Sequence, residues 1–174
     1  MAAISKRAFP QLTFLNIADN DLGTAITVEL MNCLRAGVCP LQTLILHDNR
    51  IGSTVGALLG EVLLSCSRLE VVDIKQNRLK SEGLDALFAT LDHHTLPSLK
   101  SFAFSDNEES QDVVSRFCSL IAGGCFPALE YTEWTSALSS SLPLSCDLLV
   151  AIHRAAPRLT LPLTSLSCGH RSSH

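Results

Sequence analysis

The sequence lacks any apolar run long enough to cross a membrane. Of its 174 residues 47% are hydrophobic, but Asp, Glu, Arg and Asn interrupt every candidate segment before it reaches the roughly 18 residues that a spanning helix needs. The first residues, up to Pro10, also lack the apolar stretch of a secretory signal. From these absences we predict no contact with a membrane and an intracellular, cytoplasmic location.

Signatures of catalysis and of metal binding are also missing. The sequence contains no phosphate-binding glycine loop, no His-Glu-x-x-His, no Gly-x-Ser-x-Gly and no Cys-x-x-Cys. His47 and Asp48 are neighbours, but adjacent residues at a strand end point in different directions, which argues against a base with its orienting carboxylate. In the tail, Cys168, His170 and His174 lack a fourth metal ligand. We therefore predict that the protein is not an enzyme and holds no metal and no cofactor.

Disulfides and a strong excess of one charge are not expected either. The seven cysteines are an odd number, and we interpret them as structural or neutral thiols, because a small thiol is a common packing group. The net charge of −4 is mild, so we predict no nucleic-acid partner. After Glu133 the only acid is Asp147, so the body of the chain is acidic and its tail weakly basic.

What the sequence does contain is one motif, Leu-x-x-Leu-x-Leu-x-x-Asn, four times in succession. Its asparagines are spaced 29, 28 and 30 residues apart, and a period of this length is typical of a solenoid whose units bury their apolar sides against their neighbours. We predict that the four amides stack as a structural ladder that satisfies the backbone of the turns. The copies begin at Leu12, Leu41, Leu69 and Leu99, and the ladder consists of Asn20, Asn49, Asn77 and Asn107.

Each repeat divides into two halves. The alternation of apolar and other positions within the motif predicts a short strand. Apolar residues that recur ten and fourteen positions after each Asn predict an amphipathic helix that follows it, and we expect Ser53, Ser81 and Ser110 to cap helices. The helical stripe consists of Leu30, Leu34, Leu59, Leu63, Leu87, Leu91, Phe117 and Ile121.

Units of strand and helix with this motif and period resemble the leucine-rich-repeat family, in particular its ribonuclease-inhibitor-like class. The resemblance covers Pro10 to Pro127. It implies an α/β fold, a curved horseshoe segment of a leucine-rich-repeat solenoid, with parallel strands on the concave face and helices on the convex face.

The pattern weakens toward both ends. A fifth copy starts near residue 129 but carries Thr132, Trp134 and Ala137 in place of two apolar residues and the Asn. We therefore predict a solenoid over residues 1–137, an irregular capping region with one helix over 138–164, and a disordered tail over 165–174. At the other end, about nine residues precede the first strand, so we expect its apolar flank to be partly exposed and to be completed by another chain.

The strand and turn positions that face away from the core form the candidate partner-binding surface. In place of uniformly polar residues they present an apolar centre with an acidic rim, which is the pattern of a protein interface. We expect them to bind a protein or peptide, including one with a basic surface. They are Phe14, Asn16, Thr43, Ile45, His47, Val71, Asp73, Lys75, Ser101, Tyr131 and Glu133.

The sequence favours a non-catalytic module for protein–protein interaction. One alternative is a regulator of a small GTPase, because Ran GTPase-activating proteins resemble this repeat class. Those proteins have longer arrays and a strongly acidic tail, and this chain departs from both features. Another alternative is a structural subunit of a cytoskeletal, ciliary or ribonucleoprotein assembly, which the unfinished ends suggest.

Overall fold

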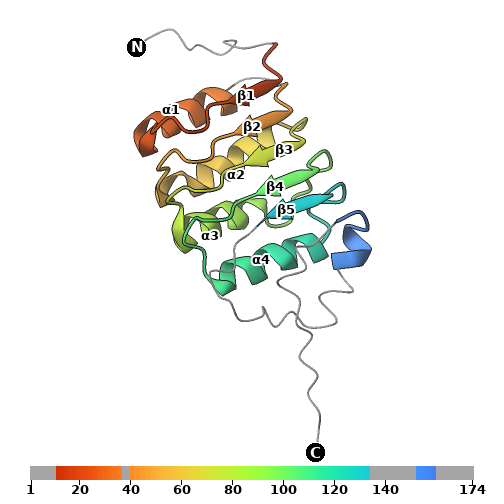
Figure 1. Ribbon diagram of the computed structural model, residues 1–174. Coiled ribbons are helices and arrows are strands. Elements are labelled where there is room, and N and C mark those ends of the chain that lie inside the picture. The colour runs from red at the N-terminus through yellow and green to blue at the C-terminus, as the bar shows by residue number, and fades with distance from the viewer. Residues whose placement is uncertain (1–10, 37–39, 134–151, 160–174) are drawn as a thin grey trace, which may run out of the picture.

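A computed structural model describes residues 11–36, 40–133 and 152–159 of the chain. It contains a five-stranded parallel sheet in sequential order. One helix follows each of the first four strands (Figure 1). In chain order the elements are β1 (Phe14–Asn16), α1 (Gly23–Arg35), β2 (Thr43–Ile45), the 3-10 turn η1 (Ser53–Val55), α2 (Gly56–Ser65), β3 (Val71–Asp73), α3 (Lys80–Leu91), β4 (Ser101–Ala103), α4 (Gln111–Ala122) and β5 (Tyr131–Glu133).

The helices form one layer on one side of the sheet (Figure 1). Neighbouring strands lie about 4.8 Å apart, whereas packed helices need about 8–10 Å. A stack of such units therefore curves toward the strands. The leucine-rich-repeat solenoid expected from the sequence, with strands on the concave face and helices on the convex face, is confirmed. In the part of the chain that the structure describes, no helix combines the length and the apolarity needed to cross a membrane.

The core is a continuous apolar spine between sheet and helices. Its central row joins the middle residue of each strand: Leu15 pairs with Leu44, Leu44 with Val72, and Val72 with Phe102. From the second repeat onward this row is closed to solvent, because Leu44, Val72 and Phe102 are at most 1% exposed. The C-terminal half adds a cluster of aromatic rings in contact, whose centroids lie 5.0–6.4 Å apart, formed by Phe88, Phe102, Phe104, Phe117 and Phe126.

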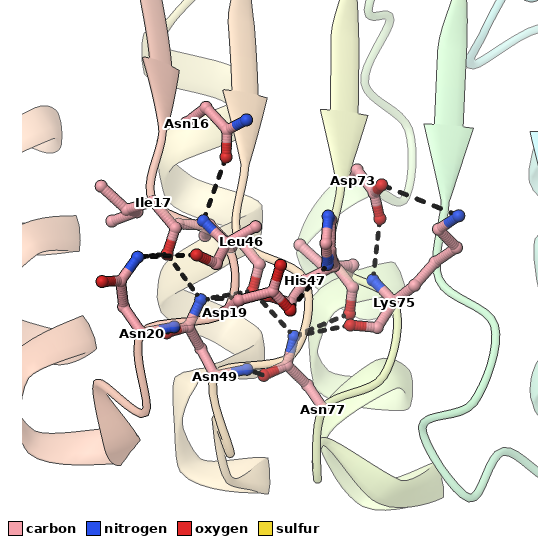
Figure 2. Close-up of polar contacts among 12 residues, drawn as sticks. Asn16, Ile17, Asp19, Asn20, Leu46, His47, Asn49, Asp73, Lys75 and Asn77 are labelled. Atoms are coloured by element: carbon pink, nitrogen blue, oxygen red, sulfur yellow. Dashed lines mark hydrogen bonds and ion pairs between the residues drawn. The ribbon is translucent and has the colours of Figure 1, made fainter.

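Buried asparagines close the turns after the strands (Figure 2). The Asn77 amide nitrogen donates to the carbonyls of Leu46, Ile74 and Lys75 at 2.9–3.1 Å. Its Oδ1 accepts the N–H groups of Asn49 and Ile51, both at 3.0 Å. One carboxamide thus joins two repeats, and buried polar backbone that would otherwise be unsatisfied is paired.

The ends of the ladder differ from its middle. Asn20 is exposed, and its amide nitrogen donates only within its own turn, to Ile17 and Ala18. At the other end the N–H of Asn107 donates to Oε2 of Glu109 at 2.8 Å, where the preceding rungs use the amide oxygen of the next Asn. The Glu109 side chain thus supplies at this rung the acceptor that an Asn supplies elsewhere.

Two of the three expected helix caps are wrong. Ser110 is the N-cap of α4, and its hydroxyl accepts the N–H of Val113. Ser53 instead opens η1, which precedes α2, and makes no cap bond. Ser81 lies inside α3, where its hydroxyl accepts the N–H of Ser110 in the next repeat at 2.9 Å. The hydroxyls of Ser81 and Ser110 therefore accept from different repeats, because α3 starts before Ser81 whereas α4 starts after Ser110.

The degenerate fifth repeat still has a closed core. Thr132 stands where the other repeats have an apolar residue; it is 2% exposed, and its hydroxyl donates to the carbonyl of Phe102 at 2.8 Å. Residues 152–155 are helical, and Ile152 and Ala156 are buried against the solenoid core. Trp134, Ala137 and the tail lie outside the described residues, so the boundaries predicted at 137 and 164 stay predictions.

Candidate protein-binding surface

The outward strand positions form two rows across the sheet. In the first row, Phe14 pairs with Thr43 on the next strand, and the same register continues through Val71 and Ser101 to Tyr131. A second row, two residues further along each strand, consists of Asn16, Ile45, Asp73, Ala103 and Glu133. Both rows lie on the face opposite the core, because side chains alternate along a strand. The rigid sheet therefore brings together residues that are 28–30 positions apart in sequence on neighbouring strands.

On its first three strands the concave face carries three apolar side chains among the polar Asn16, Thr43 and Asp73. Phe14 is 58% exposed, and Ile45 and Val71 beside it are half-buried. At the far side of the sheet the ring of Tyr131 is 47% exposed. Of the candidate residues, Phe14, Asn16 and Tyr131 are exposed, and the others are half-buried: Thr43, Ile45, His47, Val71, Asp73, Lys75, Ser101 and Glu133.

The last three strands carry a polar cluster in which Lys75 is the central cation. Its Nζ lies 3.2 Å from Oε2 of Glu133 and 3.8 Å from Oδ2 of Asp73. The Tyr131 hydroxyl donates to Oε2 of the same glutamate at 2.9 Å. Because Lys75 and Glu133 come from β3 and β5, their ion pair passes over β4. There Ala103 and the following Ser105 are small and buried, which closes part of the surface that the outward positions were expected to expose.

The cluster stabilises the carboxylate of Glu133, the ammonium of Lys75 and the neutral phenol of Tyr131. Burial favours the neutral acid of Glu133, but hydrogen bonds donated by Tyr131 and Lys75 outweigh it and hold the pKa of Glu133 below its usual value. Burial likewise disfavours the Lys75 cation, yet the hydrogen bond to Glu133 and the charge of Asp73 raise the pKa of Lys75. The pKa of Tyr131 is raised, first because its hydroxyl donates to Glu133. At neutral pH Glu133 is therefore a carboxylate, Lys75 an ammonium and Tyr131 a neutral phenol.

The turns that follow the strands form an acidic rim. Asp19, Asp48 and Asp106 occupy equivalent positions, are exposed, and have φ values of 57°, 52° and 59°. Asp and Asn tolerate this left-handed conformation better than other non-glycine residues. The repeated Asp thus has a conformational reason in addition to its charge. The backbone requirement was missed at the sequence level, although Asp precedes three of the four ladder asparagines and was a signal for it; in the third repeat Gln76 takes the position, with φ 51°.

His47 does not form a catalytic pair with Asp48. Its Nδ1 is buried without a hydrogen bond and lies 3.9 Å from Oδ1 of Asp19, on the preceding repeat (Figure 2). Within the described residues, no three His, Cys, Asp or Glu side chains are grouped so as to hold a metal ion. Cys118 and Cys125 are buried in the apolar core, and burial raises the pKa of both thiols to about 12.

Comparison with known proteins identifies the fold. No protein-family model matches the sequence, and no curated protein matches it. Leiomodin-1 actin-binding site 2 is similar in structure, with a TM-score of 0.65 and 15% identity over 86% of this chain and 81% of that one. The fold is shared. The tropomodulin C-terminal domain of Caenorhabditis elegans is likewise similar, with a TM-score of 0.63 and 17% identity over 85% of this chain and 84% of that one. At these identities the likeness shows the fold alone.

Proposed function

We propose that this chain is a non-catalytic module that binds a protein or peptide through its concave face. The observation that supports the proposal is the exposure of Phe14 and Tyr131 in one row of the strand surface. Large aromatic side chains such as these two are costly to leave in water and are common anchors of interfaces. A parallel sheet holds them rigidly, so little ordering entropy opposes association.

The polar surroundings indicate the chemistry of the partner. The pair of carboxylates on Asp73 and Glu133 is only half neutralised by Lys75, and the rim adds exposed Asp19 and Asp48. A partner with an apolar segment and nearby basic residues complements this surface. Its apolar side chains would lie over β1 to β3 and its cations along the turn rim, in a cytoplasmic setting.

The test removes the anchors without disturbing the core. Ile45→Asp with Tyr131→Ala places a charge in the apolar centre and deletes the far aromatic ring, and both side chains face away from the spine. The control is Ala57→Asp, which adds the same charge at an exposed position of α2 on the convex face. Affinity purification from the native cell, quantified by mass spectrometry, should lose its specific partners with the double variant and keep them with the control. Equal capture by both variants, with unchanged thermal melts, would refute the concave-face assignment.

A second candidate partner is actin. The observation that favours it is the structural likeness to leiomodin-1 actin-binding site 2, which extends over most of both chains. The likeness favours the cytoskeletal form of the structural-subunit alternative. Co-sedimentation with actin filaments and fluorescence titration of monomeric actin test it directly, and the absence of binding in both would remove actin from consideration.

The small-GTPase alternative remains a separate prediction. It requires that the chain accelerate GTP hydrolysis by a small GTPase, as the resemblance to Ran GTPase-activating proteins implies. A single-turnover hydrolysis assay over a panel of small GTPases measures this. A rate unchanged by the chain across the panel removes the alternative and leaves the binding proposal untouched.

A further inference from the structure

The N-terminal flank of the solenoid is open, whereas its interior and its C-terminal flank are closed. Leu12, Leu15 and Ile17 are half-buried, but their equivalents in the second repeat, Leu41, Leu44 and Leu46, are fully buried. The same contrast holds on the first helix, where Ile26 is 56% exposed and the equivalent Val55 and Val113 are buried. The fifth repeat shows no such opening, because Leu129 and Thr132 are at most 2% exposed. Among the described repeats, the exposed apolar flank is therefore a property of the first one.

This flank also presents main-chain groups aimed at a further strand. In β2, the N–H of Thr43 donates to the carbonyl of Thr13, and the carbonyl of Ile45 accepts the N–H of Ile17. Phe14 and Asn16 occupy the same register positions on β1, so their N–H and C=O groups point away from β2. Among the described strands β1 pairs only with β2. Its outer edge therefore offers a ladder of donors and acceptors next to uncovered apolar side chains.

The asparagine of the first turn specifies the direction of an incoming strand. Oδ1 of Asn49 accepts two main-chain N–H groups from the preceding repeat, those of Asn20 and Leu22, each at 3.2 Å. Oδ1 of Asn77 repeats this arrangement with Asn49 and Ile51. In the first repeat the Asn20 amide nitrogen already makes its two local bonds, so its oxygen is held ready for two donors of a segment that runs parallel to β1.

Charge on the same flank indicates what the segment carries. Asp19 stands at the end of the first turn with 70% of its side chain exposed, whereas the neighbouring Asp21 is 60% exposed and is paired with Arg50 of the second repeat at 2.8 Å. Glu29 on α1 is exposed as well, and the one arginine of this helix, Arg35, is paired with Glu61 of α2. A strand that ends in a basic residue complements this edge.

We propose that the outer edge of β1 is a second binding site, which takes an extended peptide segment of a partner protein as a sixth, parallel strand. The segment is apolar at alternate positions, so that it covers Leu12, Leu15 and Ile17, and carries a basic residue where it passes Asp19. Main-chain hydrogen bonds to Phe14 and Asn16 supply affinity, and the apolar flank supplies the burial. This site lies beside the concave face and does not depend on it.

The probe is a synthetic end-capped peptide with the sequence of residues 41–51 of this chain, since that sequence forms such a rung within the solenoid. A D48K form of the peptide places a cation in the column of Asp19 and should bind more tightly. Titration into the full isotope-labelled chain should slow amide hydrogen exchange at Phe14 and Asn16. It should also shift resonances along β1 and at Asn20 while β3 and β4 change little.

A matched pair of protein variants isolates the edge. Asn16→Pro removes one N–H that faces the free edge, and an edge position of this kind tolerates proline. Asn16→Ala makes the same side-chain change, including the loss of the Asn16 oxygen that accepts the N–H of Ala18, but keeps the main-chain donor. We expect the peptide to bind Asn16→Pro about tenfold more weakly than Asn16→Ala, with similar melts for both. Equal affinities would overturn the proposal.

Two other outcomes would also overturn it. If the amides of Phe14 and Asn16 are already protected in the free monomer, the chain covers this edge itself. If the chain forms a concentration-dependent dimer that Asn16→Pro disrupts, a second copy is the occupant. The double variant Ile45→Asp with Tyr131→Ala should still bind the peptide, so failure of this proposal is distinguishable from failure of the concave-face proposal.

Discussion

At the scale of single residues, the asparagine ladder links the repeats more tightly than apolar contact alone would. Asn77, which is 5% exposed, makes five hydrogen bonds, all of them to main-chain groups of its own repeat and of the preceding one. Loss of that side chain leaves several main-chain polar groups unsatisfied in a closed core. The free-energy cost of each unsatisfied group is larger than the net contribution of one hydrogen bond to stability.

Replacement of Asn77 by Ala should therefore destabilise the protein by at least roughly 1–3 kcal/mol. Asn20→Ala is the matched control, because the Asn20 side chain is exposed and makes its hydrogen bonds only within its own turn. Urea unfolding followed by circular dichroism measures both free energies of unfolding. A loss for Asn20→Ala as large as that for Asn77→Ala would contradict the ladder as the source of the stability.

The polar cluster on the concave face predicts a dependence of stability on pH. The pKa of Glu133 is lower in the folded state than its usual value of 4.5. The unfolded chain therefore binds more protons in this range, and the contribution of the group is present above pH 4.5 and lost as the pH falls through the folded-state pKa. Because the Glu133 side chain is 38% exposed, the contribution is at most about 1 kcal/mol.

Glu133→Gln tests this dependence. The variant should unfold at lower urea concentration than the native chain at neutral pH, and the difference should disappear in acid, below the folded-state pKa. Glu108→Gln, at an exposed turn position, is the control and should show no such convergence. A difference that stays constant with pH would mean that Lys75 and Tyr131 do not bind the carboxylate in solution.

At the scale of elements, a close backbone contact joins the start of α2 to α3. A Cβ atom added to Gly56 would stand 1.9 Å from the carbonyl oxygen of Gly83, and one added to Gly83 would stand 2.8 Å from the backbone of Ser53. Two glycines on adjacent helices thus let the backbones touch. This contact explains why η1 precedes α2: the chain must turn tightly there to bring the two helices together.

Gly56→Ala should therefore destabilise the protein although Ala is the better helix former. Helix propensity favours Ala by about 0.5–1 kcal/mol, but the overlap with a carbonyl of the neighbouring helix forces the backbones apart, at a cost of typically 1–3 kcal/mol or more. The control is Gly123→Ala at the end of α4, where the added Cβ stands 3.3 Å from the carbonyl oxygen of Ser119. Thermal unfolding should show a clear loss for Gly56→Ala and little change for Gly123→Ala. Equal melts would refute the close contact.

The elements were predictable from sequence to the extent that they repeat. The regular spacing of Leu15, Leu44, Val72 and Phe102 was enough to place them on adjacent strands, because a solenoid has one register for every unit. The contact of Lys75 with Glu133 was not predictable in the same way, since it skips one strand and depends on small residues at Ala103 and Ser105. Helix starts were also misjudged, because η1 and the interior position of Ser81 follow from contacts between repeats and leave no mark in a single repeat.

At the scale of the whole molecule, the two ends of the solenoid are unequal. The C-terminal end has Ile152 and Ala156 packed against the core, and an ion pair between Arg158 and Glu130 at 3.5 Å holds residues 152–159 to the fifth repeat. The N-terminal repeat has an uncovered apolar flank and a strand paired on one side. In a stack whose stability is a sum over neighbours, a unit with one neighbour is less stable than a unit with two.

Native-state hydrogen exchange should show this inequality as a gradient of local stability. The amides of α1 are held by contacts with the second repeat alone, so they should exchange through local opening at lower denaturant concentration than the amides of α2 and α3, which open only with the whole domain. A strand bound to the outer edge of β1 would supply the missing neighbour and raise the protection of α1 toward that of α2. Measurement of site-resolved exchange in the free chain and with the peptide of residues 41–51 distinguishes these states. Equal protection of α1 and α3 in the free chain would mean that the first repeat is closed in solution, because a repeat with an open flank must be the first to open.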